Sequence, residues 1–512
     1  MHVDLNLPEK FNAADHFVDR NIREGQGQKT AILCRDKAFT YAQIQAAMNK
    51  VGNALKGLNI EMENRVALLL LDSETFPMAF FGAIKIGAVP ICLNTLMQPK
   101  DYLYFLNDSR AKALIIDEDL YSKFEPIKDK LHFLKNIIVV GKQTPAGTTN
   151  FDAFIESASD QLEAAPTTPD DACFWLYSSG STGQPKGTIH LQHDMVYEAE
   201  TYGQQVLGVQ KNDICFSAAK LFFAYGLGNG LYFPFSVGAT SVLMPGRPTP
   251  EAVYETIANY RPTLFFGVPT LYGSMLQEEG SLDGVRLCIS AGEPLPADIF
   301  KRWKERHSVE IIDGIGSTEM AHIFISNLPG EAKPGSTGKL VPGYDYRIVD
   351  EKFQDLQTGE IGTLLIKGDS ASPGYWNKHN KTKSTMMGEW VNTDDKYMRD
   401  EEGYFYYIGR SNDMLKVGGI WVSPIEVESC LIEHSAVLEC AVVGAMDDEN
   451  LIKPKAFVVL KRGFKADDQL KKDLKEYVKK TLAYYKYPRW IEFVDNLPKT
   501  ATGKLRRFEL RA

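Results

Sequence analysis

The stretch YSSGSTGQPKG, residues 177–187, has the residue types of a phosphate-binding loop. Its glycines let the backbone turn without a Cβ clash and present N–H groups to an anion, while four hydroxyls and Lys186 add donors and positive charge. A Walker A loop needs a second glycine followed at once by lysine and a hydroxyl, whereas here Pro185 precedes Lys186 and Gly187 follows it. The stretch therefore predicts an anion-binding loop outside the P-loop class, with an ordinary surface loop as the alternative.

An α/β fold is predicted to position this loop. The apolar run CFWLY, residues 173–177, indicates a buried strand, which places the loop at a strand's carboxyl end, the usual ligand side of an α/β sheet. Other short apolar runs alternate with helical patterns through most of the chain, as expected for parallel sheets. These predicted strands are residues 65–72, 113–117, 136–141, 240–244, 262–269 and 285–292.

The chain is predicted to form two domains. From about Glu360 the sequence changes to short strands separated by Gly and Asp, which indicates a smaller β-rich subdomain. The polar, glycine-rich stretch 409–419 then follows an aromatic strand, so we predict a large N-terminal domain over residues 1–410 and a small domain over residues 411–512. The small domain has a slight basic excess, whereas the large one carries the acidic excess.

The composition excludes several classes of protein. Apolar residues make up 44% and charged residues 24% of the 512, which is ordinary for a globular chain. A net charge of −9 argues against nucleic-acid binding, because affinity for phosphate backbones needs a basic surface. The N-terminus lacks the pattern of a signal peptide, and no apolar run reaches the length of a membrane span. With seven cysteines and no C-x-x-C pair, we expect a cytoplasmic protein with reduced thiols and no membrane partner.

Four further stretches occur in order along the chain: GIGSTE (314–319), NTDD (392–395), YIGRSND (407–413) and PKTATGK (498–504). Together with the opening loop, they make the chain resemble the adenylate-forming superfamily of acyl-CoA synthetases, luciferases and peptide-synthetase adenylation domains over nearly its full length. Three longer stretches look like the benzoate–CoA ligase group. They are KLFFAYGLGNGLYFPFSVGAT (220–240), DGIGSTEMAHIFISN (313–327) and NLIKPKAFVVL (450–460).

The resemblance implies a two-step reaction. A carboxylate attacks the α-phosphorus of ATP to give acyl-AMP and pyrophosphate, and the CoA thiolate then displaces AMP. Both steps move negative charge between crowded anions, so cationic donors and Mg²⁺ are needed and a protein nucleophile is not. The implied partners are a small-molecule carboxylate, ATP and CoA; the oligomeric state stays open, with a homodimer as one option.

The resemblance also assigns nucleotide-binding residues. Thr318 would lie near the α-phosphate, Glu319 and Thr182 would hold Mg²⁺, and Asp395 and Arg410 would bind the ribose hydroxyls. The residues implied for the phosphates are Ser178, Ser179, Gly180, Ser181, Thr182, Gly183 and Lys186. Those implied beside adenine are Gly292, Glu293, Pro294, Asp313, Gly314 and Ile315.

Lys504 carries the sharpest assignment. It matches the family lysine that contacts both the carboxylate and the α-phosphate, and a compact ammonium on a flexible stem can bridge two oxyanions as the transition state forms. A solvated surface charge is the alternative. In the family the small C-terminal α+β domain is mobile, and it rotates to present Lys504 for adenylation and the KVGG stretch for thioester formation. Lys416, Gly418 and Gly419 would then border the pantetheine path.

Three positions depart from the family pattern. Asp394 replaces the glycine of the usual ribose motif, so the turn there is expected to differ. Ile315 replaces an aromatic residue that stacks on adenine in many relatives, as it does in benzoate ligases. Asn412 stands at the hinge, where Asp or Lys is common; Asn tolerates unusual backbone angles, so rotation remains feasible.

Aromatic and aliphatic residues with one histidine are predicted to frame the acid pocket, which suits a compact ring carboxylate such as benzoate. The residues are Phe223, Ala224, Tyr225, Gly316, Ala321, His322 and Ile323. Ala321 stands where benzoate ligases typically have Leu, and the smaller side chain makes a puckered cyclohexane or cyclohexene carboxylate an alternative.

Three other interpretations of the sequence are less favoured than a ligase. A non-catalytic acyl or nucleotide sensor would not need Lys504, Glu319 and Asp395 together. A peptide-synthetase adenylation domain is disfavoured by the full-length ligase resemblance. His190 and His193 invite a metal-site interpretation, but no further ligand set accompanies them, so a structural role is favoured.

Overall fold

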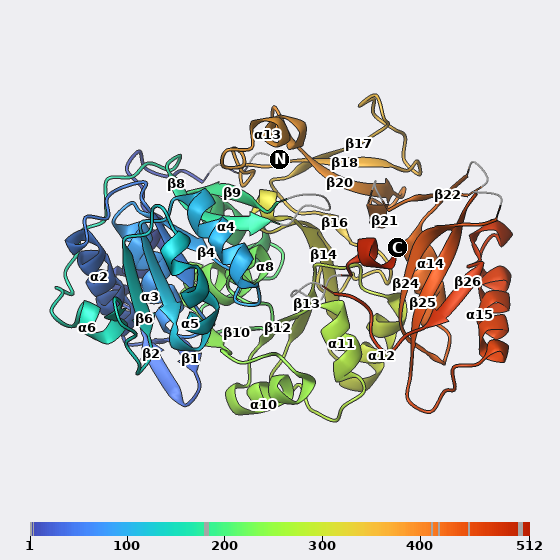
Figure 1. Ribbon diagram of the computed structural model, residues 1–512, viewed down its shortest axis with the longest axis horizontal. Coiled ribbons are helices and arrows are strands. Elements are labelled where there is room, and N and C mark those ends of the chain that lie inside the picture. The colour runs from blue at the N-terminus through green and yellow to red at the C-terminus, as the bar shows by residue number, and fades with distance from the viewer. Residues whose placement is uncertain are drawn as a thin grey trace.

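The computed structural model describes residues 3, 5–178, 184–410, 413–417, 420–448, 451–499 and 505–511, with backbone alone at positions 416, 420 and 421. Five of the predicted loop residues, 179–183, lie outside this part of the chain, as do Asn412, Gly418, Gly419 and Lys504. Figure 1 shows two α/β layers in the N-terminal portion, a β-rich layer above them, and the C-terminal portion at the opposite end of the long axis. Within the described residues, no helix is long and apolar enough to cross a membrane.

The first sheet carries the predicted loop at the end of β8. Its described strands run in the order β7-β6-β5-β3-β4-β8-β9, and all neighbours pair in parallel except β8 and β9. The strands are β3 (Arg65–Leu69), β4 (Val89–Cys92), β5 (Ala113–Asp117), β6 (Asn136–Val140), β7 (Thr149–Asn150), β8 (Ala172–Ser178) and β9 (Lys186–Leu191). The helices around it are α2 (Tyr41–Gly57), α3 (Thr75–Lys85), α4 (Pro99–Ser109), α5 (Glu118–Phe124) and α6 (Phe151–Glu156).

The second sheet delivers the GIGSTE segment. Its described strands run in the order β16-β15-β14-β13-β12-β10-β11-β1-β2 and are parallel from β1 to β14. The strands are β1 (Thr30–Cys34), β2 (Lys37–Thr40), β10 (Ile214–Ser217), β11 (Thr240–Leu243), β12 (Leu264–Gly267), β13 (Leu287–Ser290), β14 (Ile311–Gly316), β15 (Ile323–Ser326) and β16 (Lys339–Leu340). The α-helices in this portion are α1 (Arg20–Arg23), α7 (Asp194–Glu198), α8 (Ala224–Leu227), α9 (Phe233–Ser236), α10 (Pro250–Tyr260), α11 (Pro269–Met275) and α12 (Ala297–His307).

The expected parallel α/β layout is confirmed. The six strands predicted from apolar runs correspond to β3, β5, β6, β11, β12 and β13. Three of them, β11, β12 and β13, are buried at every position. A strand covered by helices on both sides favours apolar side chains on both faces, which gives a nearly continuous apolar run.

A β-rich layer follows, as predicted from the change in sequence near Glu360. Here β17, β18, β20 and β19 are neighbours in that order, and β21 pairs with β20. The strands are β17 (Asp345–Val349), β18 (Gly362–Lys367), β19 (Met386–Met387), β20 (Trp390–Arg399) and β21 (Phe405–Arg410), with α13 (His379–Thr385) before β19. Alternating burial along β20 fits a strand with one face on the core.

The C-terminal portion has its own hydrophobic core, built where α14 and α15 cover the strands. Its elements are β22 (Leu415–Val417), β23 (Ile420–Val422), α14 (Pro424–Ile432), β24 (Val437–Met446), β25 (Ile452–Leu460), α15 (Asp468–Thr481) and β26 (Trp490–Phe493). The chain then returns toward the N-terminal portion, since the Leu505 N–H donates to Glu293 Oε1 at 3.2 Å. This contact places the end of the chain against the predicted adenine segment.

Candidate active site

Glu319 lies at the meeting point of three segments. It belongs to a 3₁₀ turn, Thr318–Met320, that follows β14. Its Oε1 accepts hydrogen bonds from the Ser178 hydroxyl at the end of β8 (3.3 Å) and from the Tyr375 hydroxyl (2.7 Å). Lys186 Nζ, at the start of β9, lies 3.9 Å from the same oxygen. The β8–β9 connection and the GIGSTE segment are thus brought together, as the sequence predicted.

The surroundings keep the Glu319 carboxylate ionised. Burial raises its pKa, but the positive charge of Lys186 and the hydrogen bond from Tyr375 outweigh that effect, and the net pKa lies below the usual range. The pKa of Lys186 is lowered, because the effect of burial outweighs the opposing effect of the negative charge on Glu319. The Lys186 ammonium also lies 4.5 Å from the centre of the Tyr375 ring.

This carboxylate fits a hard cation. Mg²⁺ is commonly bound by one or two carboxylates together with substrate phosphates and water, so a single ionised Glu319 beside a phosphate loop is a sufficient protein donor. The described residues contain no group of three or more His, Cys, Asp or Glu side chains that would form a dedicated metal cage. Any cation here would therefore share its ligands with a bound anion.

The predicted ribose residues face each other across a strand pair. Asp395 on β20 is opposite Arg410 on β21, and Arg410 Nε lies 2.9 Å from Asp395 Oδ1. Arg410 Nη1 also donates to the Thr393 carbonyl at 3.1 Å. The pair presents one acceptor group and one donor group side by side, which is the pattern that a vicinal diol requires.

Asp394 occupies an irregular position within β20, at the place where the family has glycine. Its φ is +58°, in the left-handed region that favours glycine and that Asp tolerates better than most residues. The Asn392 side chain accepts the Asp394 N–H at 2.9 Å, which stabilises this conformation locally. Asp394 therefore adopts a backbone conformation that favours glycine, although it has a side chain.

The predicted adenine residues lie just after β13 (292–294) and within β14 (313–315). Gly292 has a φ of +91°, which requires glycine, and Glu293 receives the Leu505 N–H. Asp313 Oδ2 accepts the Leu295 N–H at 3.3 Å, while Oδ1 has no hydrogen-bond partner among the described residues. Burial raises the Asp313 pKa to about 8, so this side chain is suited to meet a polar ligand edge.

The predicted acid-binding residues come from two elements. Phe223 precedes α8, which begins with Ala224 and Tyr225, and the 316–323 segment lies opposite. His322 is buried, its Nε2 lies 3.1 Å from the Tyr225 carbonyl, and burial lowers its pKa to about 3. The ring is therefore neutral, with Nε2–H donating to Tyr225, and it packs among aromatic rings, 5.5 Å from Tyr225 and 4.6 Å from Phe233.

Ala321 sits at a strained position next to this wall. It has φ +61° and ψ −34°, and the His322 N–H bonds to the Met320 carbonyl at 2.7 Å, which makes a γ-turn centred on Ala321. Such a backbone costs about 1–3 kcal/mol for a residue with a Cβ, and it is usually found at functional sites. Gly316 is equally constrained, because a Cβ there would lie 2.1 Å from the His322 carbonyl oxygen.

Sequence reasoning missed Tyr375, which contacts both Glu319 and Lys186. It comes from a loop between β18 and α13, 56 residues after Glu319, and neither its residue type nor its spacing distinguishes it from other tyrosines. The predicted residues Ser179, Gly180, Ser181, Thr182, Gly183, Gly418, Gly419 and Lys504 and the Lys416 side chain are outside the described structure.

Comparison with known proteins agrees with this architecture and site. Residues 18–376 match the model of the AMP-binding enzyme family, and residues 426–504 match that of the AMP-binding enzyme C-terminal domain. The chain therefore belongs to the AMP-binding enzyme family.

Within this family it is similar to the benzoate–CoA ligase of Thauera aromatica, with 52% identity covering 99% of this chain and 97% of the relative. It is 45% identical to the 4-hydroxybenzoate–CoA/benzoate–CoA ligase of Rhodopseudomonas palustris, covering 98% and 94%. Among solved structures, an anthranilate CoA ligase in complex with anthranoyl-AMP superimposes with a TM-score of 0.96 at 45% identity, covering 99% and 97%. A benzoate CoA ligase from Burkholderia xenovorans gives 0.92 at 45%, covering 98% and 100%.

Proposed function

We propose that this chain is an AMP-forming carboxylate–CoA ligase that joins a compact aromatic acid, benzoate first, to CoA through an acyl-adenylate. The observation that carries the proposal is the 52% identity to a benzoate–CoA ligase over nearly the whole of both chains. The ionised Glu319 beside Lys186, which begins β9, supports the proposal independently. Transfer between phosphate groups needs positive charge at the phosphates, and a carboxylate can hold the cation that supplies part of it.

In the adenylation step, Lys186 and the loop residues Ser178 to Gly183 would hold the phosphates of ATP. Glu319, with Thr182, would hold Mg²⁺, which neutralises charge on the phosphates when bound. Asp395 and Arg410 would orient the ribose, and Lys504 would bridge the attacking carboxylate and the α-phosphate. These groups position two anions for in-line attack and withdraw charge from the leaving pyrophosphate.

The ring of the acid would lie against Phe223, Tyr225 and the 316–323 segment. His322 is neutral and its Nε2–H is already donated, so it adds no positive charge to the wall. A wall of uncharged aromatic groups favours a compact apolar ring and disfavours acids that carry a second charge.

In the thioester step, the domain beyond residue 410 would rotate, replacing Lys504 with the segment that contains Lys416, Gly418 and Gly419. The CoA thiolate would then attack the acyl carbonyl and AMP would leave. We place the domain boundary at residues 410 and 411, which lies between the two matched family regions.

A carboxylate panel tests the proposal. Purified protein with ATP and Mg²⁺ should release pyrophosphate with benzoate, and AMP and benzoyl-CoA should appear only when CoA is added. Aliphatic acids of similar size serve as controls for ring recognition. Pyrophosphate release without AMP formation in the presence of CoA would exclude the ligase, and failure to bind ATP would exclude the adenylate-forming activity altogether.

A second candidate substrate class follows from Ala321. Its small side chain lies next to the aromatic wall in a segment fixed by a γ-turn, and leucine there would extend further into the same space. Cyclohexane and cyclohexene carboxylates, which are thicker than benzoate, therefore belong in the same panel.

A further inference from the structure

The 3₁₀ turn that carries Thr318 and Glu319 is too short to hold its own shape. Its internal hydrogen bonds are from the Met320 N–H to Ser317 (3.2 Å) and from the Ala321 N–H to Thr318 (3.3 Å). A turn of this length forms few internal bonds, and its hydrogen-bond geometry is poorer than that of an α-helix. The orientation of Glu319 must therefore be set by groups outside the turn.

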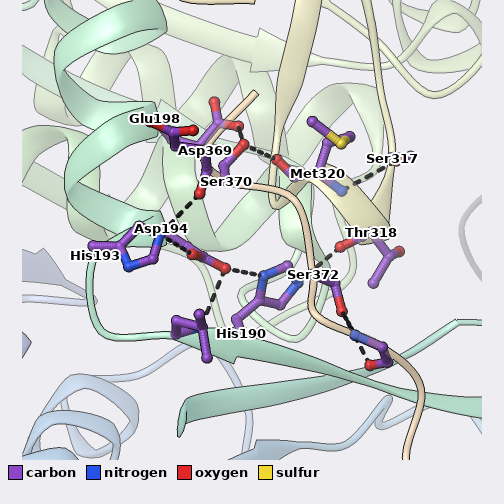
Figure 2. A network of polar contacts seen from close by, with 12 residues as sticks. His190, His193, Asp194, Glu198, Ser317, Thr318, Met320, Asp369, Ser370 and Ser372 are labelled. Atoms are coloured by element: carbon purple, nitrogen blue, oxygen red, sulfur yellow. Dashed lines mark hydrogen bonds and ion pairs between the residues drawn. The ribbon is translucent and has the colours of Figure 1, made fainter. Parts of the chain in front are cut away.

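Each carbonyl of the turn receives a donor from elsewhere in the chain. His190 Nε2 lies 2.8 Å from the Thr318 oxygen, the Ser372 N–H donates to the Glu319 oxygen at 2.8 Å, and the Ser370 hydroxyl donates to the Met320 oxygen at 2.9 Å. Figure 2 shows His190 and the segment that bears Asp369, Ser370 and Ser372 beside the turn. Of these three donors, His190 is the one that approaches Thr318.

His190 is held in turn by a buried carboxylate. Its Nδ1 lies 2.7 Å from Oδ2 of Asp194, four residues further along the chain at the start of α7, and both side chains are fully buried. The same Oδ2 accepts the Leu191 N–H at 3.1 Å. The imidazole ring also stacks on Phe174, with centroids 4.8 Å apart, so its plane is fixed.

Both ring nitrogens of His190 face acceptor groups. A carboxylate lies at Nδ1 and a backbone carbonyl at Nε2. A carbonyl oxygen can only accept, so Nε2 must donate the hydrogen bond to Thr318. His193 Nε2 lies 3.3 Å from Asp194 Oδ1, so the same carboxylate also holds a second imidazole.

We propose that His190, held by Asp194, is a positioning residue that binds the Thr318 carbonyl and so sets Thr318 and Glu319 for adenylation. The inference rests on the proposed function for the step it serves. In this role, unlike that of a metal ligand or a simple core histidine, His190 links Asp194 at the start of α7 to the turn that bears Glu319, and so restricts the movement of that turn.

Two substitutions at this position separate the two ring nitrogens. His190→Gln places an amide N–H near the position of Nε2, so it can still donate to Thr318 but loses the link to Asp194. His190→Asn places its N–H near Nδ1, so it keeps the link to Asp194 and loses Thr318. Both lose the stacking on Phe174, so the difference between them reports how the Thr318 contact compares in importance with the Asp194 link, and a larger loss for His190→Asn assigns the effect to Thr318.

His193→Gln is the matched control. His193 shares the Asp194 carboxylate, but its ring nitrogens face the Pro169 and Asp369 carbonyls, both at 2.9 Å, and within the described residues its side-chain hydrogen bonds and ion pairs do not reach the turn. The His193→Gln substitution removes an imidazole from the same carboxylate and leaves the contact between His190 and Thr318 intact.

The measurements are pyrophosphate release with benzoate, thioester formation from supplied benzoyl-AMP, and thermal unfolding of each full-length variant. We expect His190→Asn to lower kcat for adenylation by about 10²-fold with the KM for ATP little changed, because misplacement by about 1 Å has effects of this size. His190→Gln should lose much less, and His193→Gln should stay near wild type. Thioester formation should be retained in all three variants.

Equal losses for the Asn and Gln variants, a matching loss in His193→Gln, or equal losses in both half-reactions would overturn the proposal. Nitrogen NMR of labelled full-length protein at about pH 7 tests, without turnover, whether Nε2 carries the proton donated to Thr318, with His190→Gln assigning the signal. A His190 ring without a proton on Nε2 would also overturn the proposal. Since this readout needs no substrate, failure to adenylate benzoate would refute the proposed function and leave the His190 result interpretable.

Discussion

On Glu319 the described contacts from Ser178, Tyr375 and Lys186 all converge on one oxygen, Oε1. A carboxylate held in this way can turn its second oxygen toward a cation without losing its orientation. The donors also lower its pKa against the effect of burial, so the charge needed for Mg²⁺ is present at neutral pH. The same neighbouring groups therefore set both the orientation and the ionisation of the Glu319 carboxylate.

Tyr375→Phe should move the acid limb of the pH profile. Glu319 must be ionised to act, so activity falls as pH drops through its pKa, and losing the Tyr375 hydroxyl raises that pKa. The loss of kcat/KM should therefore begin at higher pH than in wild type, with the alkaline side unchanged. Tyr254→Phe, whose hydroxyl bonds the distant Met275 carbonyl, is the control. An unshifted acid limb would show that Tyr375 does not set the ionisation of Glu319.

Ala321→Leu should change ring preference. A methylene-sized change in an apolar pocket is worth about 1–3 kcal/mol, so kcat/KM for cyclohexane carboxylate should fall relative to benzoate by roughly tenfold to 200-fold. Ala321→Gly separates size from strain, because glycine adopts φ +61° freely and leaves the pocket open. An unchanged ratio of the two acids in Ala321→Leu would mean that the side chain does not face the ring.

At the level of elements, β20 and β21 set the ribose pair through their register. Asp395 is opposite Arg410, and the register of β20 is irregular near Lys396 and Tyr397 and, against β18, around Asp394. A one-residue slip would move the Asp395 side chain to the other face of the sheet. The left-handed conformation at Asp394 and the register therefore act together to present the two side chains.

Asp394→Gly and Asp394→Val test this conformation. Glycine adopts φ +58° without strain, so Asp394→Gly should retain both stability and the KM for ATP, whereas the β-branched valine should cost about 1–2 kcal/mol. Urea unfolding gives the stability difference and ATP titration gives the KM. If valine were tolerated as well as glycine, this conformation would not constrain the ribose pair.

The sequence predicted the strands well because parallel strands are buried on both faces and so form continuous apolar runs, as at residues 113–117. It also predicted that Ser178, Lys186 and Glu319 converge, through motifs shared with a family. It did not predict Tyr375, the γ-turn at Ala321 or the His190 contact with Thr318, 128 residues away. Those features depend on how loops from different sheets meet, and no local pattern encodes that.

At the scale of the whole molecule, the two half-reactions are assigned to different faces of the small domain. Lys504→Ala should reduce adenylation by about 10²–10³-fold while thioester formation from supplied acyl-AMP continues. Gly419→Leu should do the reverse, because a side chain there would obstruct the pantetheine path. Both half-reactions are measured in both variants, so each variant is the control for the other. If one variant lost adenylation and thioester formation equally, the two half-reactions would not depend on separate residues.

The contact between Leu505 and Glu293 ties the end of the chain to the adenine segment in the arrangement described here. Lys504 directly precedes Leu505, so this hydrogen bond anchors the backbone next to the predicted catalytic lysine. Glu293→Ala removes the acceptor and should lower adenylation several-fold, while the thioester step, for which we propose a rotated domain, should be unaffected. Glu293→Gln keeps an acceptor oxygen and should behave like wild type. If Glu293→Ala instead slowed both half-reactions equally, Glu293 would act through nucleotide binding in both arrangements, and the domain contact would have no separate role.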